Sequence, residues 1–159
     1  MASAGRWTQD TLKTGSWKYY HKNGAVLATE DYANGKLSVC QCYTEDGKAL
    51  DTAECREVEA APAGGLPGWR RFLEKGLQRM LEAKANSREW PAGQRTVVVR
   101  FVVEKDGSLS ELKPLTQYGK GMEEEVVNLL KRSPKWTPGR QRGQLVRSYH
   151  TQPLTFVIQ

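Results

Sequence analysis

The sequence lacks long apolar runs. None of its windows approaches the roughly 18 apolar residues typical of a membrane-spanning helix. The start, MASAGRWTQD, has no apolar core of the kind found in a secretory signal. We therefore expect either a cytoplasmic protein or a piece of a longer, exported chain.

The motifs of common enzyme classes are also missing. The chain has no HExxH pattern, no glycine-rich loop followed by Lys and Ser or Thr, and no Ser/His/Asp set with a family spacing. Its two histidines, His21 and His150, lie far apart in the sequence. We expect no enzymatic activity, no catalytic residue, no cofactor and no metal site.

Acidic residues are missing from the last part of the sequence. The net charge is +6, but the chain up to Glu57 has seven Lys/Arg against eight Asp/Glu, and the remainder has seventeen against ten. No acid follows Glu125, whereas six basic residues do. This asymmetry favours two modules, which we place at residues 1–57 and 62–159.

Cysteines are few and close together. Cys40, Cys42 and Cys55 lie within sixteen residues, and Cys40 and Cys42 would share one face of a strand. Free thiols and a disulfide to Cys55 in an oxidising compartment remain open alternatives. A metal site is the least favoured third alternative, because a zinc site lacks a nearby fourth ligand. Which cysteines pair is not decided by the sequence.

The first module contains a repeated turn pattern. A tyrosine precedes a turn dipeptide three times, at Asn23-Gly24, Asn34-Gly35 and Asp46-Gly47, with β-prone segments between the turns. Asn-Gly and Asp-Gly favour tight hairpins because both residues tolerate positive φ. The pattern predicts a β-hairpin meander and resembles MORN-like repeats, which implies a structural module, a spacer or a second binding surface.

The second module alternates helical and extended patterns. Apolar residues recur at helical spacing from Trp69 to Leu81, and a second amphipathic stretch runs from Met122 to Arg132. Strands are expected at 95–104, at 108–115 with a bulge or loose pairing, and at 144–159. We predict an α+β fold in which a small antiparallel sheet carries two helices on one face.

The segment KRSPKWTPGRQRG, residues 131–143, is basic and contains Trp136. One interpretation is a nucleic-acid grip in which this tryptophan stacks on bases. The alternative is a stop for the second helix at Pro134, a core position for Trp136, and a basic loop at 140–143 that leads into the last strand. We favour the second interpretation, without a nucleic-acid partner, because no recognised nucleic-acid motif is present.

Three stretches of the second module closely resemble the TonB C-terminal domain, from about Pro62 to the end. They are VVVRFVVEKDGSLSELKPL, the glutamate-rich helix that leads into SPKWTP, and the closing QPLTF. The usual tyrosine-proline pair near the end of the first helix is replaced by Gln78-Arg79-Met80, which leaves the choice of partner open.

The resemblance implies a role in the periplasm, in a protein anchored to the inner membrane by a part absent from this chain. Its partners would be the TonB box of an outer-membrane transporter, added as a strand, and proton-driven motor proteins of the inner membrane. An adaptor of a membrane sensor that binds a peptide without transport is the alternative, and a strand-exchanged homodimer is plausible. The residues expected at the binding edge are Gln144, Leu145, Val146, Arg147, Ser148, Tyr149, His150 and Thr151.

Overall fold

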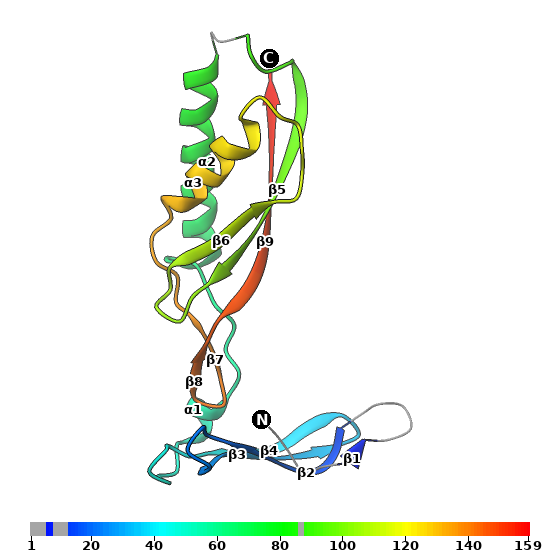
Figure 1. Cartoon of the computed structure of the whole chain (residues 1–159), viewed down its shortest axis with the longest axis vertical. Coiled ribbons are helices and arrows are strands. Elements are labelled where there is room, and N and C mark those ends of the chain that lie inside the picture. The colour runs from blue at the N-terminus through cyan, green and yellow to red at the C-terminus, as the bar shows by residue number, and fades with distance from the viewer. Residues whose placement is uncertain (1–5, 8–12, 86–87) are drawn as a thin grey trace. The chain divides into compact units, whose positions relative to one another are not determined.

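The computed structural model describes residues 6–7, 13–85 and 88–159. The architecture is α+β, as the sequence predicts, with small antiparallel sheets and few helices (Figure 1). The chain forms two units. One comprises Met1–Val58 with Arg140–Leu145, and the other comprises Glu59–Gly139 with Val146–Gln159.

The first unit is built on the expected hairpin meander. Four antiparallel strands lie in chain order: β1 (Arg6–Trp7), β2 (Lys13–Tyr20), β3 (Val26–Ala33) and β4 (Lys36–Cys42). The β3–β4 turn places Asn34 at φ 51° and Gly35 at φ 80°. Two successive positive φ values give a type I′ turn, whose twist suits the flanking strands.

A short helix, α1 (Thr52–Cys55), follows the meander and was not expected from the sequence. Its start is a capping box, because the Asp51 side chain accepts from the Glu54 N–H and the Glu54 side chain accepts from the Asp51 N–H. The helix carries Cys55 to β4, where Cys55, Cys42 and Ala28 form a small buried cluster.

A hairpin of β7 (Gly139–Gln141) and β8 (Gln144–Val146) replaces the basic loop expected at 140–143. Arg142 at φ 52° and Gly143 at φ 76° occupy the two central turn positions. The expectation of a loop was wrong because arginine seldom adopts positive φ, so the Arg-Gly pair carries little turn signal.

The tip of this hairpin belongs to the first unit, where Arg142 contacts the carboxylate of Glu30 and the ring of Tyr19. Its Nε donates to Glu30 Oε1 at 2.8 Å, and its guanidinium lies 3.5 Å from the Tyr19 ring centroid. The Tyr32 hydroxyl donates to Glu30 Oε2 at 2.7 Å. Burial is the main cause, and the hydrogen bond to Glu30 the second, that raises the pKa of Tyr32 above its ordinary value. The Glu30 carboxylate is therefore buried but paired.

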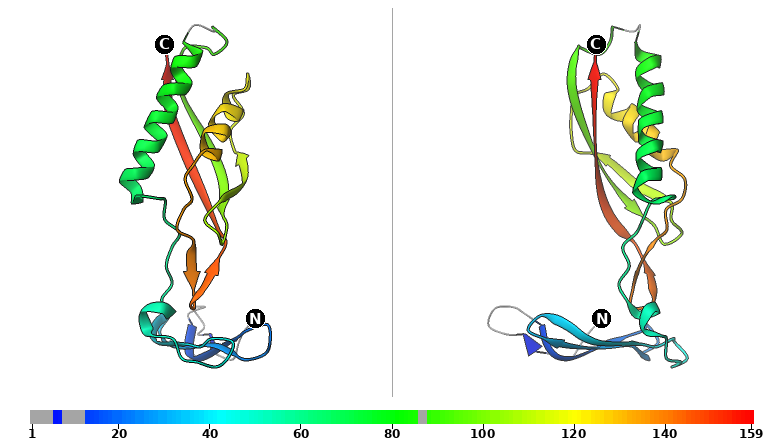
Figure 2. Two further views of the ribbon diagram at one scale, coloured as in Figure 1. Left: turned by 90° about the vertical axis from the view of Figure 1, so that its left-hand side faces the viewer. Right: turned by 180° about the vertical axis from the view of Figure 1, so that it is seen from behind.

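The second unit contains two helices and a three-stranded sheet. The helices are α2 (Gly65–Lys84) and α3 (Met122–Lys131), and the strands are β5 (Gly93–Val103), β6 (Leu109–Pro114) and β9 (Ser148–Ile158), in the order β6-β5-β9. Both helices cover the same face of the sheet (Figures 1 and 2). This is the arrangement that the sequence predicts.

The core lies between that face and the helices. The inward residues of β5 are Val97, Val99, Phe101 and Val103, each at most 1% exposed. They pack with the apolar stripes of both helices, with Leu154 and Phe156 of β9, and with Trp136. Trp136 makes an edge contact with Phe101 at 5.5 Å, so its predicted core position is confirmed and it is not available for base stacking.

The predicted bulge is also present. The β5–β6 register shifts between Arg100 and Val102, and Glu111 on β6 has φ 49°. The β-turn after β5 places Gly107 against the segment that leaves α3, where Trp136 N donates to Gly107 O at 2.8 Å. A β-carbon at Gly107 would lie 2.0 Å from the Trp136 carbonyl oxygen.

Gly107→Ala should lower the free energy of unfolding by about 3 kcal/mol, because it combines a positive φ with a backbone clash. The matched control is Gly119→Ala, where φ is also positive (+80°) but no atom of the described part of the chain lies within 4 Å of the added carbon. The control should cost only about 1 kcal/mol. Urea unfolding of both variants measures the difference, and equal losses would contradict a role for the contact with Trp136.

Arg142→Ala should destabilise the first unit by about 3 kcal/mol, because it leaves the buried Glu30 carboxylate without its cation. Amide hydrogen exchange in β2 and β3 should then accelerate about a hundredfold. Arg140→Ala is the control, since Arg140 is exposed and, among the described residues, its side chain makes only a 3.5 Å hydrogen bond to Gly143 O. Unchanged exchange in Arg142→Ala would show that the ion pair contributes nothing.

Candidate functional site

The residues predicted for a binding edge fall in two different strands. Gln144, Leu145 and Val146 form β8, which pairs with β7, while Ser148, Tyr149, His150 and Thr151 begin β9, and Arg147 lies between the two strands. The single strand expected at 144–159 is thus divided. The division follows from the β7–β8 hairpin, which takes up the residues before Arg147.

One edge of β9 has no strand beside it in the described chain. Strand β9 pairs with β5 along its whole length, from Ser148↔Val103 to Ile158↔Gly93, and is the terminal strand of its sheet. An open edge of this kind offers backbone donors and acceptors to another extended segment. The candidate edge therefore runs over Ser148–Ile158, beyond the predicted limit at Thr151.

The hydrogen bonds of β5 show which β9 groups face outward. Val98 uses its backbone toward the β6 side, because its N–H donates to Thr116 Oγ1 and its carbonyl accepts from Leu115 N. Its neighbours Val97 and Val99 therefore face β9, where they pair with Leu154 and Gln152. The alternation of an antiparallel ladder then directs the odd-numbered β9 residues to the open edge.

Pro153 provides independent support for this orientation. Proline has no N–H to donate, so it is tolerated where the missing donor would face solvent. The outward-facing set is therefore Tyr149, Thr151, Pro153, Thr155 and Val157. All of them except Pro153 can both donate and accept at the edge.

The same five residues carry their side chains on the sheet face without helices. All five are exposed, with Tyr149 at 66% and Val157 at 57%, whereas Leu154 and Phe156 between them are buried. Tyr149 also lines a shallow hollow of about 270 Å³ with Arg100, Leu112 and other residues of β5 and β6. The edge thus combines free backbone groups with an apolar and aromatic surface.

Arg147 is held by two carboxylates at the beginning of β9. It donates to both oxygens of Glu104, at 2.8 and 3.1 Å, and to Glu111 at 3.3 Å. The hydrogen bonds from Arg147 and then from Ser110 lower the pKa of Glu104, and the hydrogen bond and charge of Glu104 raise the pKa of Arg147. Its guanidinium is therefore engaged within the unit.

His150 faces the core side of β9. Its ring stacks on Phe101 at 5.7 Å and lies 5.3 Å from Trp136, and burial lowers its pKa below the ordinary value. His150 is consequently a packing residue rather than an edge contact. Gln152 also faces the core side, since its side-chain oxygen accepts a hydrogen bond from Trp69 Nε1 at 2.8 Å.

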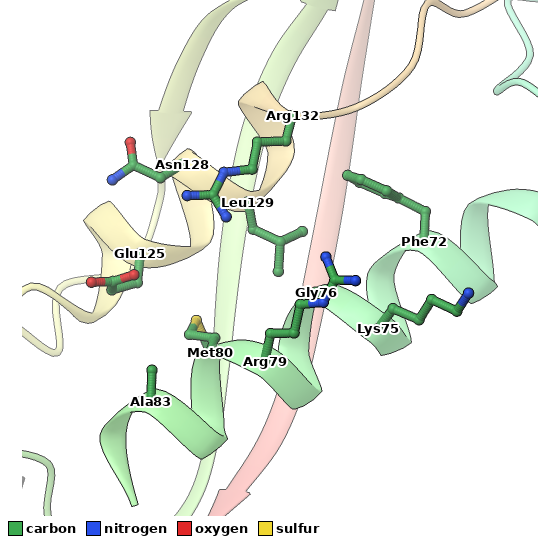
Figure 3. A pocket seen from close by; sticks show the side chains of 10 residues that line it. All are labelled: Phe72, Lys75, Gly76, Arg79, Met80, Ala83, Glu125, Asn128, Leu129 and Arg132. Carbon is green, nitrogen blue, oxygen red and sulfur yellow. The ribbon is translucent and has the colours of Figure 1, made fainter.

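A second surface feature lies between α2 and α3 (Figure 3). This cleft has a volume of about 420 Å³; Lys75 and Arg79 border it from α2, and Arg132 borders it at the end of α3. Glu125, on the same wall, lies 4.0 Å from the Lys84 amine. The two helices approach closely at Gly76, where a β-carbon would lie only 2.6 Å from Leu129 Cδ1.

Sequence reasoning missed two features of the candidate edge. Pro153 could have revealed which backbone groups face outward, since proline within a strand marks an unpaired donor position. A strand was predicted as far as residue 159, but the extent of its open edge to Ile158 depends on pairing with β5, which is distant in sequence. Within the described residues, no helix has the length and apolar content of a membrane span.

Among the comparisons with known proteins, one finds a similarity, and it covers part of the chain. A search of curated proteins found no match, and a search of solved structures found none. Residues 93–158, from the first residue of β5 to the last residue of β9, match the family model described as Gram-negative bacterial TonB protein C-terminal, a family of protein-interaction domains. This match supports the TonB C-terminal family for the segment that contains the open edge.

Proposed function

We propose that this chain is a periplasmic protein-interaction module of a TonB-like energy transducer. In this proposal, β9 captures the TonB box of an outer-membrane transporter as an added strand. The observation that carries the proposal is the open edge of β9 inside the segment that matches the TonB C-terminal family. Proton-driven motor proteins of the inner membrane would act through a membrane-anchored part of the same protein.

The chemistry of the edge suits an extended peptide. The free N–H and C=O groups of Tyr149, Thr151, Thr155 and Val157 supply sequence-independent affinity, as in other cases of β-strand addition. Specificity would come from the outward side chains, with Tyr149 and the adjacent hollow as the apolar contact. Pro153 interrupts the row of donors, so the captured peptide needs no acceptor opposite that position.

The first module supplies a spacer or a second binding surface in this proposal. Its meander resembles MORN-like repeats, and we place the functional division at residues 1–57 and 62–159. The open edge of β9 could also pair with a second copy of the chain, since an unpaired strand is a template for self-association.

An adaptor that binds a peptide for a membrane sensor is the alternative function. It would use the same edge without transmitting force, so binding measurements alone do not separate the two. Crosslinking in cells from photo-reactive residues at Thr151 and Thr155 would separate them. Capture of an outer-membrane transporter supports the transducer, and capture of other proteins alone supports the adaptor.

Thr151→Pro should weaken binding of a TonB-box peptide about tenfold, because it removes one outward donor and its hydrogen bond. The measurement is a titration of the isotope-labelled chain by NMR, which also reports whether the fold is kept. Thr151→Val is the matched control, since it changes the side chain but keeps the N–H, and it should bind as the wild type does.

Position 148 is unsuitable for this test, because the Ser148 N–H faces β5 and a proline there would damage the sheet itself. Equal affinities of Thr151→Pro and the wild type would contradict strand addition at β9. Peptide-induced shifts confined to Gln144–Val146 would instead place the site on β8.

A further inference from the structure

Three cysteine sulfurs meet in the first unit. Cys40 and Cys42 lie two residues apart on β4 and therefore face the same side, while α1 delivers Cys55 opposite them. All three Sγ atoms lie within 4.8 Å of one another, and the Sγ atoms of Cys40 and Cys42 are 3.9 Å apart. The Cys55 sulfur is close enough to form a disulfide with either Cys40 or Cys42.

A sulfur atom in a disulfide has one sulfur partner, so Cys55 can be joined to only one of the two at a time. The third thiol then lies beside the disulfide, within reach of it. We propose that this cluster is a thiol–disulfide exchange site. In it, Cys55 alternates between Cys42 and Cys40, and the Cys40 thiolate attacks small external disulfides and forms a mixed disulfide with one half of them.

The internal step conserves atoms and electrons. The Cys40 thiolate attacks Cys55 Sγ, the Cys40–Cys55 bond forms, and the Cys42–Cys55 bond breaks with its electron pair leaving on Cys42. The proton lost by Cys40 is taken up by Cys42 through solvent. No oxidant or reductant is consumed, because one disulfide and one thiol are present before and after the step.

The two pairings, Cys42–Cys55 and Cys40–Cys55, expose the remaining free thiol to external reagents to different degrees. Cys42 is 0% exposed and Cys55 is 2% exposed, whereas Cys40 is only partly buried. The free thiol is therefore accessible when Cys42 holds Cys55, and protected when Cys40 does. In the accessible form, the Cys40 thiolate can attack a small disulfide such as oxidised glutathione, which yields a mixed disulfide on Cys40 and one released thiol.

The partner chemistry is thus that of a disulfide, and an oxidising compartment such as the bacterial periplasm keeps the internal bond formed. Exchange requires a thiolate, so it stops in acid. Acid quenching therefore preserves whichever pairing is present at that moment and allows it to be identified.

The experiment compares two labelling orders on the oxidised wild-type chain. In the first, the native protein is quenched in acid, unfolded there and labelled with N-ethylmaleimide, and fragment-ion mass spectrometry locates the label. We expect one label per chain, divided between Cys40 and Cys42. In the second, the native protein is labelled at pH 8, and we expect the label to gather on Cys40 because exchange continually re-exposes it.

Label on a single cysteine after acid quenching would overturn the alternation, as would label on Cys55 or the absence of a free thiol. For the external step, oxidised glutathione should add one glutathionyl group to Cys40 of the native chain. Addition elsewhere, or none, would overturn that part of the proposal.

Two variants act as matched controls. Cys40→Ser leaves only Cys42 and Cys55, and Cys42→Ser leaves only Cys40 and Cys55, so each should form one disulfide, show no free thiol and resist glutathione. A free thiol in either folded variant would contradict the proposed pairings. The wild-type labelling remains decisive if a variant does not fold, because it uses no substitution.

Discussion

The pairing of β5 with β9 is the interaction on which the second unit depends. It joins residues as distant as Gly93 and Ile158 and holds eleven residues of each strand in one register. That register sends alternate residues of β5, from Val97 to Val103, inward together with Leu154 of β9. A slip by one residue would turn the buried set outward, so the core strongly specifies the register. The same register fixes which backbone groups of β9 remain unpaired, and the candidate edge is thus a direct consequence of how the core is packed.

Much of this unit could be predicted because its local patterns agree with its tertiary structure. The apolar stripe of α2 and the alternation in β5 have the periods of the elements that they form, and Trp136 enters the core as expected. The division of the last strand could not be predicted in the same way. It arises from a turn at Arg142 whose partner, Glu30, is 112 residues away, and no local pattern encodes such a pair.

The candidate edge illustrates the same limit at the level of single atoms. A sequence can nominate the last strand of a domain, but the direction of each N–H depends on its neighbour. Here, the hydrogen bond from Leu115 N to Val98 O shows that the Val98 backbone faces β6. The alternation of an antiparallel ladder then fixes which N–H and C=O groups of β9 face away from β5. Pro153 is the one position where the sequence alone carries this information. Arg147 and His150, both predicted edge residues, are instead engaged by Glu104 and by the core.

The first unit has few apolar contacts to stabilise it, because a meander of short strands has little apolar surface to bury. Its buried cluster consists of Ala28, Cys42 and Cys55 with a few partly buried neighbours. A core of this size offsets little of the conformational entropy lost on folding. Covalent linkage through Cys55 and the buried ion pair between Glu30 and Arg142 therefore carry a larger share of the stability than they would in a thicker domain. Since both contacts join strands of the meander to segments outside it, the meander alone, without α1 and the hairpin tip, would lack the interactions that fix its fold.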